Sequence, residues 1–181
     1  MCYNANGVHK RCFHVIGVFM TRREREITDE NEIKDLLEGC EYLHLGLVDK
    51  GAPYVVPLNY GVDYVGDKTY IYLHGANTGR KLDIIRENSI CCFTMERNVE
   101  SFEGKVACQY GMIYECLMGT GNVYIVEDPQ EKIHGLEVLM KTQTGKDDFK
   151  FDERLVSIVS VMRIDVDSIS AKRRPRRQDE Q

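Results

Sequence analysis

The stretch from Pro53 to Lys81 constrains the fold of this 181-residue chain more than any other segment. Its sequence, PYVVPLNYGVDYVGDKTYIYLHGANTGRK, predicts two strands, over residues 53–60 and 69–74, with a polar turn at 63–68 between them. Runs of β-branched and aromatic residues bounded by glycine and aspartate are typical of a β-hairpin. A loop with two glycines, residues 75–79, then leads into a helix that begins with a basic pair. We therefore expect a hairpin followed directly by a helix entry.

The remaining segments alternate short strands with a few helices. Asp29, with Glu32 three residues later, has the form of a capping box, and Gly39 is suited to the C′ position that ends a helix. Asp128 followed by Pro129 predicts another helix start. The full set of predicted segments is helices over 27–39, about 79–87 and from Asp128 onward, strands over 42–48, 89–95, 114–126 and 155–166, a bulge near 119–121, and polar loops over 98–105 and 143–151.

These segments indicate a mainly β fold. Six to seven strands, mostly antiparallel in hairpin-like succession, accompany about three short helices. Closing such a sheet into a barrel removes exposed strand edges. We therefore predict a small β-barrel with flanking helices, whereas a doubly wound parallel sheet fits the order of segments poorly.

Composition limits the classes of function. With 43% apolar and 29% charged residues, the chain is typical of one soluble globular domain. A net charge of −5 argues against a nucleic-acid partner, and no apolar run approaches the ~20 residues that span a membrane. The seven cysteines have no C-x-x-C spacing. We accordingly expect a cytoplasmic protein with free thiols and no metal site.

A single domain is expected over residues 20–172. Residues 1–19 are interpreted as an N-terminal extension, flexible or non-native, because the apolar run from Phe13 to Met20 is followed by no signal-peptide cleavage site. Residues 173–181 form a polar basic C-terminal tail, which is more typical of a solvated chain end than of a nucleic-acid arm.

Pro57 lies inside a predicted strand, where it cannot donate a ladder hydrogen bond. It therefore marks a strand edge or a bulge. The backbone of its neighbours Val56, Leu58 and Asn59 is then free to meet a flat heteroaromatic ring with donor and acceptor edges. Taken alone, the proline is equally compatible with an ordinary edge strand.

The helix entry after His74 has the composition of a phosphate site. Gly75 and Gly79 permit close backbone approach or positive φ, and Thr78 with the pair Arg80–Lys81 adds a hydroxyl and two cations. Free N–H groups at a helix N-terminus bind phosphate, and cations add charge-assisted hydrogen bonds. The spacing is neither a Walker loop nor a Rossmann fingerprint. His74 by itself is more typical of a structural histidine at a strand end.

Together these motifs resemble the FMN-binding split-barrel superfamily of pyridoxamine-phosphate oxidase and, within it, the nitroimidazole-resistance (Nim-like) proteins. The resemblance covers about Met20 to Lys172. It rests on RREREITD, PYVVPLNYG, IYLHGANTGRKLD, YECLMGTGNVYIVEDPQEK and RIDVDSISAK, of which the H-G-A-x-x-G-x-K element is the most specific.

The resemblance implies a homodimer with one FMN per subunit at the subunit interface. Residues 56–59 would then line the isoalloxazine ring, His74 and Gly75 would lie near the ring or ribityl chain, and Lys81 with Arg80 would hold the phosphate. In Nim-like proteins the histidine that matches His74 is associated with the active site, so His74 is the candidate catalytic residue. Cys116 stands where the family commonly has serine, and a thiol is the weaker hydrogen-bond donor.

The function implied is an FMN-dependent oxidoreductase that reduces a small aromatic or nitroaromatic substrate with an external electron donor. Flavin carries the electron chemistry, so no nucleophile–base pair is needed. His74 could donate a proton, because the reference pKa of histidine lies near neutrality. Two alternatives stay open: a flavin- or haem-binding carrier or sensor without turnover, and a small β-barrel interaction domain with an empty site. Oxidation of pyridoxamine phosphate itself is not expected, since basic residues for a second phosphate are not found.

Overall fold

The computed structural model describes residues 22–175, and the structural statements below concern this part of the chain. The predicted extension at residues 1–19 and the last residues of the predicted tail lie outside it. In chain order the elements are η1 (Arg23–Arg25), β1 (Glu26–Ile27), α1 (Glu30–Gly39), β2 (Leu43–Asp49), β3 (Ala52–Leu58), β4 (Tyr60–Val65), β5 (Lys68–Ala76), α2 (Arg80–Glu87), β6 (Ile90–Phe102), η2 (Ala107–Gln109), β7 (Gly111–Ile125), α3 (Pro129–Thr144), α4 (Glu153–Ser157) and β8 (Val159–Arg174).

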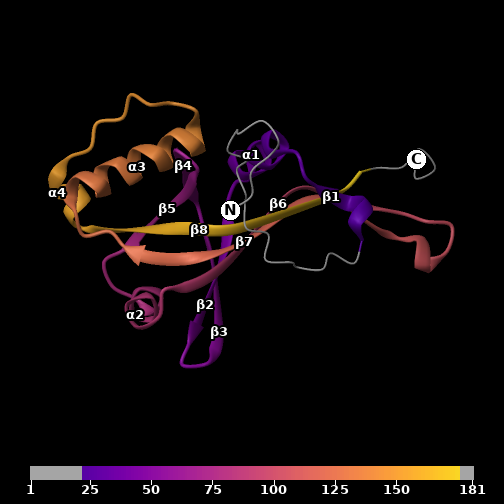
Figure 1. Cartoon of the computed structure of the whole chain (residues 1–181), viewed down its shortest axis with the longest axis horizontal. Coiled ribbons are helices and arrows are strands. Elements are labelled where there is room, and N and C mark those ends of the chain that lie inside the picture. Colours follow the sequence, from indigo (N-terminus) through magenta and orange to yellow (C-terminus); the bar gives the residue numbers. More distant parts are fainter. Residues whose placement is uncertain (1–21, 176–181) are drawn as a thin grey trace, which may run out of the picture.

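An eight-stranded antiparallel sheet makes up most of the described chain. Its strands follow the order β3-β2-β6-β7-β8-β5-β4, and β1 pairs with β8 beside this path. Figure 1 shows β8 running across the molecule, with α3 and α4 on one side of it and α2 and the β2–β3 hairpin on the other. β3 and β4 are the two ends of the path, so the sheet does not close. The predicted mainly β split-barrel fold with antiparallel strands is confirmed.

The stretch from Pro53 to Lys81 contributes to both ends of the sheet. The predicted pairing of its two strands with each other is wrong, because β3 ends at Leu58 and pairs with β2, whereas β4 begins at Tyr60 and pairs with β5. The tight hairpin within the stretch is β4–β5, with Gly66 at φ 61° in its turn. What looked in the sequence like one strand is therefore two, separated at Asn59.

The side chain of Tyr60 explains this change of direction. It is fully buried, and its hydroxyl lies 2.6 Å from the carbonyl oxygen of Leu37 and 3.0 Å from that of Cys40, so one proton is shared between two carbonyls at the end of α1. The side-chain amide of Gln143, on α3, donates to the carbonyl of Tyr60 at 2.9 Å. At Gly61 a Cβ would collide with the backbone of α3. Helices α1 and α3 thus meet β4 at its first two residues.

Two strands run further than the sequence predicts. β6 continues through residues expected to form a polar loop and reaches Phe102, with a register shift between Arg97 and Glu100. The last strand begins at Val159, after α4, and continues to Arg174, so the first residues of the expected tail pair with β7. Charged residues at both places suggest a loop, but in the fold a neighbouring strand supplies the ladder hydrogen bonds, and such tertiary pairing overrides weak strand propensity.

The predicted helix starts of α1 and α3 are confirmed. Asp29 accepts hydrogen bonds from two N–H groups of the first turn, at 2.9 and 3.0 Å, and Asp128 accepts one at 2.9 Å. The predicted bulge is confirmed by a register shift between Thr120 and Gly121. Gly39 is the last residue of α1 rather than a C′ glycine, and a Cβ there would collide with a side chain of β6.

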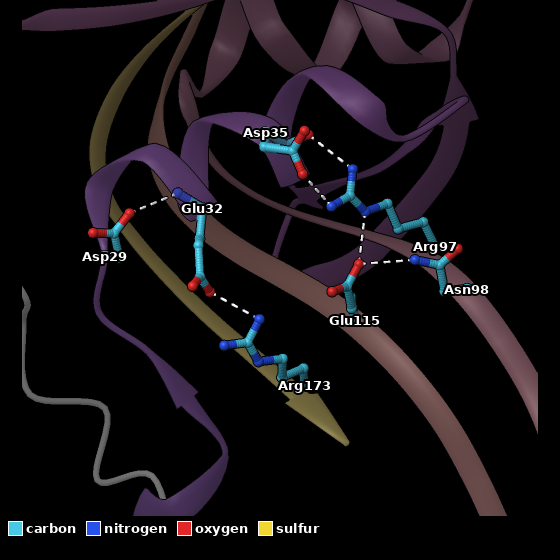
Figure 2. A network of polar contacts seen from close by, with 7 residues as sticks. All are labelled: Asp29, Glu32, Asp35, Arg97, Asn98, Glu115 and Arg173. Carbon is cyan, nitrogen blue, oxygen red and sulfur yellow. Dashed lines mark hydrogen bonds and ion pairs between the residues drawn. The ribbon is translucent and has the colours of Figure 1, made fainter. Parts of the chain in front are cut away.

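Helix α1 is fastened to the sheet by a network of ion pairs and hydrogen bonds (Figure 2). Arg97 of β6 binds the carboxylate of Glu115 on β7 at 2.7 Å. The same guanidinium binds Asp35 of α1 through its carboxylate and, at 3.0 Å, through its carbonyl oxygen. Arg173 of β8 pairs with Glu32 of α1 at 2.9 Å. One helix is therefore held across three neighbouring strands.

The main hydrophobic core is built from the sheet together with α1 and α2. A smaller cluster centred on Tyr72, Val126 and Val161 lies beside it and includes residues of α3. In residues 22–175, no helix is both long enough and apolar enough to cross a membrane. The largest fully buried side chains are those of Leu36, Leu37, Leu43, Leu45, Tyr60, Ile71, Leu73, Leu82, Met95, Leu117, Met162 and Ile164.

Replacing the tyrosine at the helix–sheet junction tests its role. Tyr60→Phe keeps the buried ring but leaves two carbonyls without the hydroxyl proton, so we expect the free energy of unfolding to fall by about 1–2 kcal/mol. Urea denaturation followed by circular dichroism measures this change. Tyr124→Phe, at an exposed position of β7, is the matched control and should shift the value by less than about 0.5 kcal/mol. Equal effects of the two substitutions would contradict this role.

Candidate functional site

The candidate site lies where β5 ends and α2 begins. β5 is held between β4 and β8, with His74 opposite Val161. Helix α2 starts at Arg80, after Gly79, whose φ of 135° favours glycine. Within residues 22–175 no side chain caps this helix, and the Leu82 N–H donates to the Gly79 carbonyl at 2.9 Å, so the N–H groups of Arg80 and Lys81 at its start have no capping side chain.

The side chain of Lys81 lies back over Gly75. A Cβ added to this glycine would lie 2.8 Å from the Lys81 Nζ atom and 2.9 Å from its Cε atom. Glycine is thus needed here because a side chain would displace the lysine from its present position. The ammonium group is consequently held against the end of β5.

His74 is half-buried and carries a buried nitrogen, Nδ1, that has no hydrogen-bond partner in the described residues. Burial lowers the pKa of the imidazole, and the positive charge of Lys81 lowers it further. The ring is therefore neutral at pH 7. An unsatisfied buried polar atom costs about 1–3 kcal/mol, which a ligand that bonds to it would recover.

These features together fit an anion such as a phosphate monoester. The ammonium of Lys81 provides the charge, the uncapped start of α2 provides N–H donors, and Gly75 leaves room for close approach. The neutral imidazole offers one further hydrogen-bonding atom without adding charge. The site can bind and orient a ligand, but it holds no nucleophile paired with a base.

Arg80 faces a different set of partners from its neighbour. Its guanidinium binds the Asp49 carboxylate through Nε at 3.0 Å and Nη2 at 2.9 Å, and lies 5.1 Å from the centre of the Tyr54 ring. Asp49 ends β2 and Tyr54 lies on β3. Arg80 thus ties the start of α2 to the β2–β3 hairpin. Its predicted contact with a phosphate stays a prediction.

The four residues predicted to line a ring lie on or just after β3, at the edge of the sheet. Val56 and Leu58 are partly buried and pack against the main core, so only their backbone is available to a ligand. Pro57 is exposed on the edge strand, where its missing N–H is tolerated, as the sequence predicted. Asn59 is exposed between β3 and β4. Their contact with a ring stays a prediction.

Two predicted residues stand apart from this group. Thr78 is exposed in the loop before α2. Cys116 pairs with Glu96 of β6 and Lys172 of β8, whereas the part of β7 that lies across β8 from His74 is around Ile125. At ~3.3 Å per residue, that separation along β7 is roughly 30 Å. The single chain therefore does not bring Cys116 to His74, and burial raises the pKa of its thiol.

Asp49 and Tyr54 were missed by the sequence analysis. Asp49 was expected in the turn after the strand predicted over 42–48, but it is the last residue of β2 and pairs with Ala52. Tyr54 lies on a strand, as predicted. The sequence carries no signal for their contact with Arg80, because Asp49 is 31 positions away along the chain. An aspartate and an aromatic residue flanking one hairpin turn were the only available hint.

A family profile described as pyridoxamine 5′-phosphate oxidase matches residues 29–173. A search of curated proteins found no match. Among solved structures, a candidate 5-nitroimidazole antibiotic resistance protein from Bacteroides thetaiotaomicron is 32% identical, over 81% of this chain and 85% of that one, with a TM-score of 0.69.

Two more distant structures share the architecture. The flavocytochrome Anf3 from Azotobacter vinelandii is 17% identical, over 88% of this chain and 77% of that one, with a TM-score of 0.70. The FAD and heme binding protein from Mycobacterium smegmatis is 16% identical, over 86% of this chain and 78% of that one, also with a TM-score of 0.70. At these identities the two comparisons show the fold alone.

The proximity of Lys81 to His74 predicts a linked titration. Lys81→Met keeps the apolar stem and removes the charge, so the pKa of His74 should rise toward its ordinary value. NMR titration of the imidazole C–H signals measures this pKa in both proteins. Lys68→Met, at the far end of β5, is the matched control and should leave the pKa unchanged. An identical His74 titration in the wild type and Lys81→Met would show that the ammonium lies elsewhere.

Proposed function

Because the chain belongs to the pyridoxamine 5′-phosphate oxidase family, we propose that it is an FMN-dependent oxidoreductase that reduces nitroaromatic compounds of the 5-nitroimidazole type. One observation carries the proposal. At the uncapped start of α2, the Lys81 side chain lies over Gly75, beside a histidine with an unsatisfied buried nitrogen. This arrangement has the charge and donors that a flavin phosphate requires.

Each part of the site has a separate task in this proposal. Lys81 and the first N–H groups of α2 bind the phosphate, and the exposed edge of β3 presents backbone groups to the ring. Arg80 holds the start of α2 against the β2–β3 hairpin through its contacts with Asp49 and Tyr54. When bound, the flavin supplies the electron-transfer chemistry. His74, neutral at pH 7, orients the ligand or substrate through hydrogen bonds, and any proton it donates comes from a neutral N–H.

The substrate class is proposed from the relative that shares most sequence with this chain among those described. Its description names 5-nitroimidazole antibiotic resistance. The alternative, flavin or haem binding without turnover, is favoured by the two distant structures, which are described as a flavocytochrome and as an FAD and heme binding protein. The two proposals differ in whether the reduced flavin is reoxidised by a nitroaromatic substrate.

We further propose that the site is shared between two copies of the chain. Within one chain Cys116 is roughly 30 Å along β7 from the residues that lie across β8 from His74, so it can join the site only from a second copy. Light scattering of the FMN-loaded protein tests the dimer, and a monomer that retains FMN would exclude a shared site.

The phosphate assignment predicts a ligand-dependent effect of Lys81→Ala. A charge-assisted contact contributes roughly 1.5–3 kcal/mol, so FMN should bind the variant more than tenfold more weakly. Riboflavin has the same ring without the phosphate, and its affinity should change little. Fluorescence titration measures both ligands, with Lys68→Ala as the matched control. Unchanged FMN affinity, or equal losses for both flavins, would refute the assignment.

Nitroaromatic reduction predicts fast reoxidation of the reduced protein. When dithionite-reduced, FMN-loaded protein is mixed anaerobically with a 5-nitroimidazole, the oxidised flavin absorbance should return in a phase whose rate rises with substrate concentration. His74→Asn, which keeps a hydrogen-bonding side chain without the ring, should slow this phase by about tenfold or more. A reduced flavin that persists until oxygen is admitted would favour the carrier or sensor.

A further inference from the structure

A cavity of about 760 Å³ lies between β4, α3, the end of α1 and the loop that follows α3. Its lining includes Glu38 of α1, Tyr64 of β4, Glu137 of α3 and Phe149 of the loop. None of His74, Gly75, Arg80 or Lys81 lines it. This cavity is therefore distinct from the site proposed for flavin, and its volume is within the usual range for small-molecule sites.

The hydroxyl of Tyr64 is buried and faces the carboxylate of Glu38, and its oxygen accepts no hydrogen bond within residues 22–175. Burial raises the pKa of this hydroxyl, and the nearby carboxylate of Glu38 raises it further, so the group stays protonated. A buried hydroxyl oxygen that accepts no hydrogen bond leaves a position for a donor from another molecule. Its oxygen can accept a hydrogen bond from a donor that enters the cavity.

The charges around the cavity are mostly negative. Asp63 pairs with His134 at 2.8 Å, whereas Glu38, Glu137 and Asp147 form no ion pair within residues 22–175. One ammonium, that of Lys141, also lines the cavity. Another, that of Lys34, lies 5.1 Å from the centre of the Tyr64 ring. Carboxylates in a partly enclosed space attract a cation more strongly than carboxylates on an open surface.

Apolar side chains form the rest of the wall. Val62 of β4, Val138 of α3 and the ring of Phe149 line the same space. A ligand that complements these carboxylates and apolar walls would combine a cationic head with an apolar or aromatic body. We propose that the cavity binds a small organic cation, a protonated amine carried on an aromatic body, with its ammonium between Glu38, Asp147 and the Tyr64 hydroxyl.

The experiment is calorimetric titration of the full-length, FMN-saturated protein with tryptamine, an aromatic primary amine. Indole-3-propionate has the same ring and a negative charge, and serves as the ligand control. We expect saturable tryptamine binding with one site per chain. Glu38→Gln and Asp147→Asn should each weaken it about tenfold, since a hydrogen bond to a charged group is lost in each case. Glu103→Gln, at an exposed position near the β6–β7 turn, should have no effect.

Tyr64→Phe isolates the hydroxyl. It removes the hydroxyl and keeps the ring in place, so the variant should fold while binding tryptamine severalfold more weakly. Lys81→Ala should bind tryptamine as the wild type does, which separates failure of this proposal from failure of the flavin site. The proposal is overturned if tryptamine does not bind, if indole-3-propionate binds equally well, or if Glu103→Gln matches the cavity variants.

Discussion

The burial of Tyr60 between the sheet and α1 is the constraint on which the rest of the structure depends. Its ring fills the core and its hydroxyl proton is shared by two carbonyls at the end of α1, so the chain turns inward immediately after Asn59. β3 is thereby left at one end of the sheet, and β4 starts the other end. β3 and β4 are therefore consecutive in sequence but do not pair with each other, and β4 pairs instead with β5, the strand that ends at the candidate site.

The neighbouring residues Arg80 and Lys81 have different roles in the candidate site. Arg80 is engaged by Asp49 and the Tyr54 ring, which fixes the start of α2 against the β2–β3 hairpin. Among the described residues Lys81 has no such partner, and its side chain lies over Gly75. From the sequence, Lys81 was predicted to hold the phosphate together with Arg80. Their different surroundings make Arg80 a positioning residue, whereas Lys81 is the cation available to a ligand.

The features that could be predicted are those whose causes are local. The aspartate caps of α1 and α3, the start of α2 after Gly79 and the bulge at Thr120 depend on residues within a few positions of each other. The pairing of β3 and the length of β8 could not be predicted, because both depend on partner strands distant in sequence. Cys116 shows the same limit, since a motif match gives no distance between residues on different strands.

The sequence by itself determined that this chain forms an antiparallel β fold and places a glycine loop with two cations at a helix entry, because these follow from side-chain periodicity and backbone freedom. Only the tertiary structure decided which cation stays available, since Arg80 meets Asp49 across 31 positions of chain. It also decided that His74 is neutral, because burial and the charge of Lys81 act on it only in the folded protein. The cavity beneath α3 has the same origin: its carboxylates and the Tyr64 hydroxyl come from separate elements and become neighbours only through packing.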